Sequence, residues 1–351
     1  MKSYRYPSHR HRGFSLVELM VAMVVGLIIL GTVSAIMVNT NKNYTATDST
    51  ARLQENARFA MQFITTDLRR AGYFGCTDDI SVVSSTLNGS GGAGGLALNA
   101  LEGVQSVGTG TWQPSAVATS FTYPVTGSDA FAIRYLDLDN PITIQKEMPN
   151  ESAVLFVNTG HGLKANDIIA VTDCDSADIM QLTNVNASGS SGKDNLVHNA
   201  GSGTPGNSTQ KLSKSYGTNA TVLKFNSAQY YIGTSVSGLN RSLYRITSAG
   251  TQELVEGVEN MQILYGIVTT ADRVPSTYVT ADGVGNWSNV ISVRVGLLLS
   301  SVANTADGQS GQDIDTKTYD VDGTNIARID PTDDRRIRKV FTSTIMLRNI
   351  K

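Results

Sequence analysis

The sequence contains few of the residues from which enzymes build catalytic and metal sites. Among its 351 residues are only four histidines and two cysteines. His9 and His11 lie in a basic N-terminal segment, and neither His161 nor His198 has the spacing of a His-Glu-x-x-His zinc site. The sequence also lacks a Gly-x-Ser-x-Gly nucleophile motif and a phosphate-binding Gly-Lys-Ser/Thr loop. We therefore expect no catalytic site and no cofactor.

Charged residues are also scarce, and their distribution argues against nucleic acid as a partner. They make up 17% of the chain, where about a quarter is typical. The net charge is −2, but residues 1–13 hold four basic residues and no acid, so the rest of the chain is acidic. The one short basic run, Arg335 to Lys339, directly follows Asp333 and Asp334. Such a run is typical of a salt-bridged surface and is a weak signal for nucleic acid.

The two cysteines, Cys76 and Cys174, form the complete set. In a domain exported to an oxidising space, a single pair is expected to form one disulfide. That bond would close a loop of about 100 residues and stabilise the fold by roughly 4–5 kcal/mol. The alternative is a pair of buried thiols.

One long segment lacks both charge and proline. It runs from Leu19 to Val38, and its twenty residues are enough to cross a hydrocarbon core of roughly 30 Å as a helix. The basic segment before it predicts that the N-terminus stays in the cytoplasm and that the rest of the chain is translocated. A secretory signal cleaved near Val33–Ala35, or a plain membrane anchor, would explain the apolar run. Neither explains the acid Glu18 at its start, because a charge in a membrane helix is costly.

The residues around Glu18 form a specific pattern. Gly13-Phe14-Ser15-Leu16-Val17-Glu18-Leu19 resembles the type IV prepilin signature. The resemblance implies that a prepilin peptidase cuts between Gly13 and Phe14 and that the new N-terminus is methylated at Phe14. It also implies that Glu18, the fifth residue of the mature chain, pairs with the N-terminus of a neighbouring subunit. Pairing within one subunit, across one turn of the helix, is the alternative.

We expect the helix to continue beyond the membrane as an amphipathic helix that ends at Ala71, with Gly72 as its cap. Apolar residues recur at steps of three and four along this part: Leu53, Ala57, Ala60, Met61, Ile64 and Leu68. This stripe should cover a globular domain. The stretch Asn39–Thr50 is poor in helix formers, so a break there is an open alternative. Unlike many major pilins, the chain has no helix-kinking proline near residues 33–36, which predicts a straighter helix.

The chain thus divides into four parts. Residues 1–13 are a leader, residues 14–38 a transmembrane half-helix and residues 39–72 an amphipathic half-helix. Residues 73–351 are a β-rich domain exported to the periplasm or the cell exterior.

Beyond residue 72 the sequence predicts strands without long helices between them. The clearest alternation of apolar residues runs from Ile291 to Leu299. The predicted strands are Ser120–Tyr123, Ala130–Leu136, Ile142–Glu147, Ala153–Val157, Asp167–Thr172, Ile179–Leu182, Thr221–Phe225, Gln229–Gly233, Ser242–Thr247, Met261–Val268, Asn289–Ser300 and Ile337–Asn349. They predict an antiparallel sheet packed on the N-terminal helix, an α+β fold. Residues 85–97 and 184–220 are expected to be polar loops, and Leu254–Asn260 is a candidate short helix.

An acidic cluster near the C-terminus is a weak candidate for calcium binding. Asp313, Asp315, Asp320 and Asp322 alternate with other residues, and hard oxygen ligands suit this ion. The spacing does not match an EF-hand loop, because a lysine and a tyrosine fall where ligands are expected. A solvated turn is the favoured interpretation.

Several blocks of the exported domain resemble the PilW group of minor pilins. They surround Cys76 and Cys174 and cover Leu254–Gly266 and Arg335–Asn349. The resemblance implies a type IV pilin-like fold, with a long N-terminal helix packed on a large antiparallel sheet. It also implies a low-copy subunit that primes type IV pilus assembly and sits at or near the pilus tip.

The same resemblance implies partners and a location. The partners would be other minor pilins, the major pilin, the prepilin peptidase and methylase, the inner-membrane assembly platform and a large tip adhesin. The chain would wait in the bacterial inner membrane as a single-pass protein and reach the pilus after assembly. A minor pseudopilin of type II secretion is the close alternative. A tip module whose loops bind a surface, sugar or DNA is another.

Overall fold

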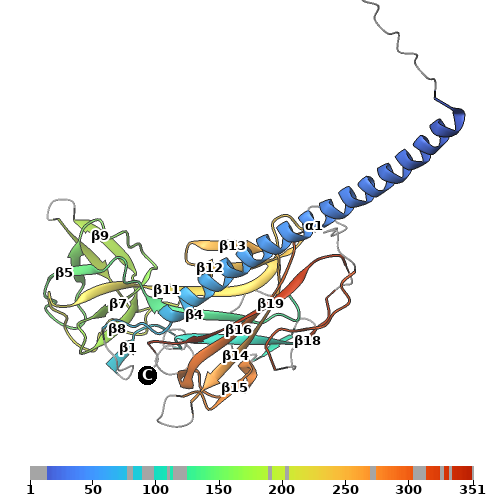
Figure 1. Ribbon diagram of the computed structural model, residues 1–351. Coiled ribbons are helices and arrows are strands. Elements are labelled where there is room, and N and C mark those ends of the chain that lie inside the picture. Colours follow the sequence, from blue (N-terminus) through green and yellow to red (C-terminus); the bar gives the residue numbers. More distant parts are fainter. Residues whose placement is uncertain are drawn as a thin grey trace, which may run out of the picture.

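One long helix leads into a domain with two β-rich lobes in the computed structural model of the chain (Figure 1). The structure describes residues 14–76, 82–88, 99–108, 111–113, 125–188, 192–201, 205–268, 274–302, 314–324, 328–331 and 334–349. The leader 1–13, the expected strand Ser120–Tyr123, Asp313 and most of the stretch 85–97 lie outside this set.

Helix α1 (Leu16–Arg70) is uninterrupted over 55 residues, roughly 80 Å at 1.5 Å per residue. The stretch 39–50 contains no break. It is rich in threonine and asparagine, which are weak helix formers. However, the hydroxyls of Thr45, Thr47 and Thr50 donate to backbone carbonyls four residues earlier, so these side chains are satisfied inside the helix.

The second half of α1 packs on the β-domain through the predicted apolar stripe. The stripe residues at most 2% exposed are Leu53, Ala57, Ala60, Ile64 and Leu68, with Met61 half-buried beside them. They share one core with Phe131 and Tyr230 of the larger sheet and Val293 of the smaller sheet. The helix is therefore held by both sheets, and the predicted stripe is confirmed as core.

In the described part of the chain, the larger sheet has thirteen strands, and all of their pairings are antiparallel except for one parallel pair. Its strands are β1 (Val83–Ser85), β2 (Leu101–Gly108), β3 (Thr111–Gln113), β4 (Ala130–Leu136), β5 (Ile142–Lys146), β6 (Leu155–Asn158), β7 (Ile168–Thr172), β8 (Ala177–Gln181), β9 (Asn184–Ser188), β10 (Lys193–Val197), β11 (Thr221–Thr234), β12 (Arg241–Thr247) and β13 (Gly250–Glu256). The parallel pair is β1 with β8.

Strand β11 joins the two lobes (Figure 1). Its first residues pair with β5 and β7, the next with β4 and the last with β12. The sequence predicts two strands here, Thr221–Phe225 and Gln229–Gly233. They form one strand because residues 226–228 continue the ladder with β4. We call residues 137–224 the outer lobe.

The smaller sheet has four antiparallel strands in the order β15-β14-β16-β19. These are β14 (Val258–Ile267), β15 (Thr277–Val279), β16 (Val290–Ser300) and β19 (Arg338–Met346), accompanied by the 3-10 turns η2 (Ala281–Gly283) and η3 (Trp287–Asn289) and by the ribbon of β17 (Tyr319–Asp320) and β18 (Arg328–Ile329). The predicted strand at Ile291–Leu299 is confirmed, but both of its faces are buried. The carbonyl of Val321 lies directly over Gly296, so the chain near β17 covers the strand face that holds this glycine.

The prediction of a short helix at Leu254–Asn260 is wrong. Its first residues end β13, and Val258 begins β14. Gly257 makes the turn between them in a left-handed conformation (φ 90°). Its N–H donates to Arg241 and its carbonyl accepts from Ser300. Pairing with neighbouring strands therefore overrides the local sequence preference.

Residues 184–220 are not the long exposed loop that their composition predicts. Strands β9 and β10 form a hairpin, and β10 also pairs with β6. Leu196 and Tyr216 are fully buried in the core of the outer lobe. The buried carboxylate of Asp178 accepts hydrogen bonds from Ser213 and Tyr216. Polar groups satisfy one another inside this lobe, so it folds without a continuous apolar pattern.

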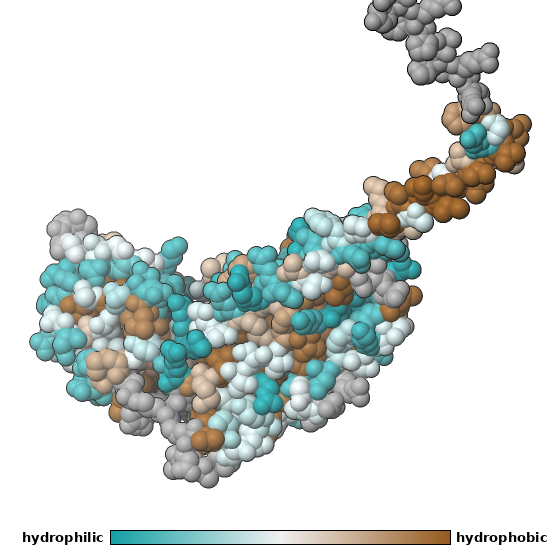
Figure 2. Space-filling model, viewed as in Figure 1, coloured by the Kyte–Doolittle hydropathy of each residue, from teal (hydrophilic) through white to brown (hydrophobic). Residues whose placement is uncertain are grey.

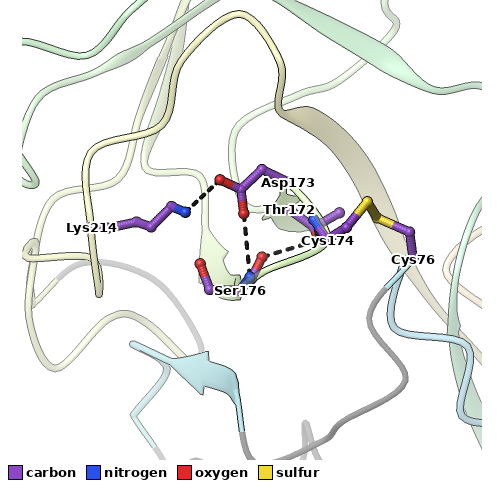
Figure 3. The surroundings of a disulfide bond; sticks show 6 residues. All are labelled: Cys76, Thr172, Asp173, Cys174, Ser176 and Lys214. Atoms are coloured by element: carbon purple, nitrogen blue, oxygen red, sulfur yellow. Dashed lines mark hydrogen bonds and ion pairs between the residues drawn. A yellow bond between two sulfur atoms is a disulfide. The ribbon is translucent and has the colours of Figure 1, made fainter.

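The predicted disulfide joins Cys76, just after α1, to Cys174 in the turn between β7 and β8 (Figure 3). The two Cα atoms are 4.8 Å apart, and the sequence separation is 98 residues. Asp173 holds the turn, because it accepts from the N–H of Ser176 and pairs with the ammonium of Lys214. Burial alone would raise the pKa of Asp173, but its hydrogen bond with Lys214 contributes to a net lowering of that pKa. The disulfide thus fastens the outer lobe to the end of α1.

A buried carboxylate anchors the helix to the larger sheet. Asp67 is 5% exposed on the docked face of α1. It accepts a hydrogen bond from the hydroxyl of Tyr230 and lies 3.5 Å from the guanidinium of Arg245. Burial and the charge of Asp67 raise the pKa of Tyr230, so the phenol remains the donor.

Asn349 closes the C-terminal end of α1. The side-chain amide of Asn349 donates to the carbonyls of Arg69, Arg70 and Ala71, groups that a helix end leaves without partners. Gly72 follows in a left-handed conformation (φ 75°), as its predicted capping role requires.

Replacement of Asp67 by alanine is expected to lower the free energy of unfolding by about 3 kcal/mol, because Tyr230 and Arg245 lose their shared buried acceptor. Asp48→Ala is the matched control. Asp48 lies on the same helix, but its pair with Arg52 is exposed and contributes less than about 1 kcal/mol. Urea unfolding of both full-length variants in detergent measures the difference. Equal stability of the two variants would contradict the anchor.

Removal of the disulfide by the double change Cys76→Ser and Cys174→Ser is expected to lower the free energy of unfolding by about 4 kcal/mol, since the unfolded chain loses a long cross-link. Dithiothreitol should destabilise the wild type equally and leave the double variant unchanged. A wild-type unfolding midpoint that is insensitive to the reductant would show that the bond does not stabilise the fold.

Candidate assembly site at the helix N-terminus

The N-terminal half of α1 has no covering partner within the described part of the chain. Its large apolar side chains between Leu16 and Val38 are each 49–74% exposed. Figure 2 shows them as a continuous apolar band on the projecting helix. The segment is long and apolar enough to cross a membrane. Hydrocarbon or the apolar faces of other helices are the environments that such a surface requires.

Ser15 and Glu18 begin the helix as a reciprocal capping box. The N–H of Glu18 donates to the hydroxyl of Ser15 at 3.2 Å, and the N–H of Ser15 donates to the carboxylate of Glu18 at 3.4 Å. A carboxylate in the first turn also interacts favourably with the helix dipole. The role of Ser15 was missed in the sequence, although the spacing Ser-x-x-Glu before an apolar run signals it.

Phe14 lies outside the helix and is 85% exposed. Ser15 has an extended backbone, with φ −74° and ψ 151°. Gly13, the residue before the expected cut, lies outside the described residues. Phe14 and Glu18 are therefore found together at the bare end of the helix, ahead of the apolar band.

Asp315, Asp320 and Asp322, the described acids among those considered for calcium, each have a different protein partner. Asp315 pairs with Arg338 at 3.3 Å, Asp322 accepts from Thr324, and Asp320 accepts from a backbone N–H of the next turn. Among the residues that the structure describes, no three His, Cys, Asp or Glu side chains are grouped as metal ligands. Protein contacts account for these carboxylates.

The basic run near the C-terminus is part of a salt-bridge network, as its acidic neighbours predicted. Arg338 is 2% exposed at its side chain and pairs with Glu259 and Asp334. Arg336 lies near the same two acids. Burial alone would lower the pKa of Arg338, but its hydrogen bonds to these two acids raise that pKa above its usual value. The network ties β19 to β14.

The two histidines of the exported domain have structural contacts in the outer lobe. His161 accepts a hydrogen bond from a backbone N–H at Nδ1, and its Nε2 lies 3.3 Å from Asp194. His198 has Nε2 3.0 Å from the carbonyl of Ala153. Burial lowers the pKa of His198, which favours the neutral ring.

Two family models match the chain, at its opposite ends. Residues 8–34 match the prokaryotic N-terminal methylation motif, and residues 229–349 match the family described as Type IV Pilus-assembly protein W. No curated protein matches the chain. Among solved structures, a type IV-like pilin from Thermus thermophilus is similar at 11% identity with a TM-score of 0.33, over 85% of this chain and 97% of the other.

One match covers the exposed N-terminal half of α1, and the other covers strands on which its second half packs. The methylation motif covers Phe14, Glu18 and most of the bare apolar helix. The second match covers the end of β11 and all strands from β12 to β19, which include those that hold the docked half of α1. Residues 229–349 are thus similar to the family described as Type IV Pilus-assembly protein W, and residues 8–34 to the N-terminal methylation motif, which together support a pilin role for the chain.

Proposed function

We propose that the chain is a minor pilin that primes assembly of a type IV pilus and sits at or near the pilus tip. The bare apolar half of α1, with one acid in its first turn, carries this proposal. In the inner membrane this half is a single-pass anchor with the exported domain in the periplasm. After assembly it is the surface that packs against neighbouring subunits.

The charges at the N-terminus give the assembly its register. Cleavage after Gly13 creates an ammonium at Phe14, and methylation keeps that charge. In hydrocarbon, a carboxylate and an ammonium each need a partner. Glu18 of one subunit meets this need by pairing with the N-terminus of its neighbour. The exposure of Glu18 supports this role, since within the described residues its carboxylate is bonded to the N–H of Ser15 at its own helix cap.

The shape of the exported domain supports a position at the tip. The outer lobe extends the domain well beyond the helix (Figure 1), and a broad two-lobed subunit is easier to place at the end of a filament than in its repeating shaft. The partners are other minor pilins, the major pilin, the prepilin peptidase and methylase, and the inner-membrane assembly platform. A large tip adhesin is the further partner.

Glu18→Ala is expected to leave membrane insertion intact, because the apolar surface of the helix is unchanged. It is expected to lower incorporation into sheared pili at least tenfold, because the charge that pairs with the neighbouring subunit is lost. Glu18→Gln keeps the capping geometry without the charge, and Ser15→Ala removes the cap but keeps the charge. Immunoblots of sheared pili should show a defect for Glu18→Gln and near-normal incorporation for Ser15→Ala. Glu55→Gln, an exposed acid on the same helix, is the control. The opposite ranking would assign Glu18 to capping alone.

Gly13→Ala is expected to block processing, because the prepilin signature places glycine directly before the cut. Mass spectrometry of the wild-type protein from membranes should find an N-methylated chain that begins at Phe14. The variant should retain residues 1–13, whereas Ser8→Ala in the same leader should be processed normally. A mature chain that begins elsewhere, or normal processing of Gly13→Ala, would contradict the proposal.

A further inference from the structure

A cleft of about 360 Å³ lies between the two lobes, apart from the assembly site. This volume is in the range of small-ligand pockets. The floor comes from β4, β11 and β12, and one wall comes from the outer lobe at Asn166–Ile168. Leu87 and Pro205 complete the rim.

The strand register places the floor on the sheet face opposite α1. Gln229 lies directly across from Ala132 on one side and from Ile246 on the other. Residues directly opposite one another in a ladder share a face. The alternate residue Tyr230 is in the core under α1. The cleft is therefore separated from the docked helix by the thickness of the sheet.

Several uncharged polar groups of the cleft are free to bind a ligand. Ser227 is exposed and Gln229 is half-buried in the floor, and Asn166 is exposed on the wall. Within the described part of the chain, the side chains of these three residues make no hydrogen bond. They supply one hydroxyl and two amides, which both donate and accept. Phe225 and Ile246 provide apolar surface beside them.

The charged groups of the cleft are already paired. The ammonium of Lys224 is 2.9 Å from Asp167, and the guanidinium of Arg134 is 2.8 Å from Glu102. Arg134 also donates to the carbonyl of Asn99. An anionic ligand would have to displace an existing carboxylate, so the site offers little net attraction for a charge.

A peptide strand is also a poor fit for the floor. Peptides that extend a sheet need a free strand edge. Here β4 is paired with β2 and β11, and β11 is paired with β4 and β12. The floor therefore presents side chains and not open backbone groups.

We propose that this cleft binds a neutral carbohydrate, with the sugar's hydroxyls bonded to Ser227, Gln229 and Asn166 and its apolar face against Phe225 and Ile246. Free hydroxyl and amide groups beside an apolar surface suit a ligand that is itself uncharged, rich in hydroxyls and apolar on one face. The site would give the exported domain a binding activity that is independent of subunit packing.

The test uses the full-length protein in a zwitterionic detergent, because alkyl glycosides carry sugar headgroups. Maltotriose, chitotriose and a galactose trisaccharide are the neutral probes, and a sulfated heparin disaccharide and trialanine are the competitors. Saturation-transfer NMR and calorimetric titration measure binding. At least one neutral probe should bind saturably, and neither competitor should displace it.

Two variants locate the binding. Ser227→Trp fills the cleft and should weaken binding at least tenfold, while Gln229→Ala should weaken it several-fold. Thr344→Trp, an exposed position on β19, is the matched control and should bind as the wild type does. Thermal unfolding verifies that each variant is folded.

Three results would overturn the proposal. These are the absence of binding by all three neutral probes, unchanged affinity in both Ser227→Trp and Gln229→Ala, and tighter binding of the sulfated probe or the peptide in the same cleft.

Discussion

The docking of the second half of α1 on the β-domain is the interaction on which the rest of the structure depends. Its apolar stripe repeats every three to four residues, so a slide of one turn, about 5.4 Å, would again place apolar residues against the sheets. The buried carboxylate of Asp67 removes this ambiguity, because only one position brings it to Tyr230 and Arg245. A misplaced carboxylate would be buried without a partner, which costs several kcal/mol. The apolar stripe thus stabilises the docking of the helix, and Asp67 fixes the position of the helix along the sheets.

Prediction from the sequence succeeds for the elements whose apolar residues recur with a simple period. It fails where contacts between residues far apart in the chain determine the structure. The helix, its stripe and the strand at Ile291–Leu299 are periodic, and the structure has all three. The outer lobe was misread as a loop at residues 184–220, because its buried polar groups satisfy one another and leave little apolar pattern. At the candidate assembly site, a short sequence motif is enough to single out Phe14 and Glu18. The cap by Asn349 is not, since 278 residues separate it from Ala71.

Strand β11 and the disulfide both hold the outer lobe to the rest of the protein. Strand β11 runs from one lobe into the other without a break, and the disulfide between Cys76 and Cys174 fastens the β7–β8 turn to the end of α1. Within the outer lobe, the ion pair of Lys224 with Asp167 joins β11 to the segment before β7 at the cleft. A cleft between parts held in this way is formed before any ligand arrives. Such preorganisation lowers the entropic cost of binding.

The geometry of Glu18 suits an acid that is present both in the single membrane-anchored subunit and in the proposed filament. Its carboxylate is 3.4 Å from the N–H of Ser15, a long and therefore weak hydrogen bond. Release of this bond costs little, and the hydroxyl of Ser15 still caps the N–H of Glu18 at 3.2 Å. A neighbour's N-terminal ammonium offers a charge-assisted bond in a medium of low dielectric constant, which is much stronger. Under the proposed mechanism, the acid is loosely held in the single subunit and tightly held in the filament. In the proposed mechanism, the difference between these two states is what brings the neighbours into register, and it requires no change in the helix itself.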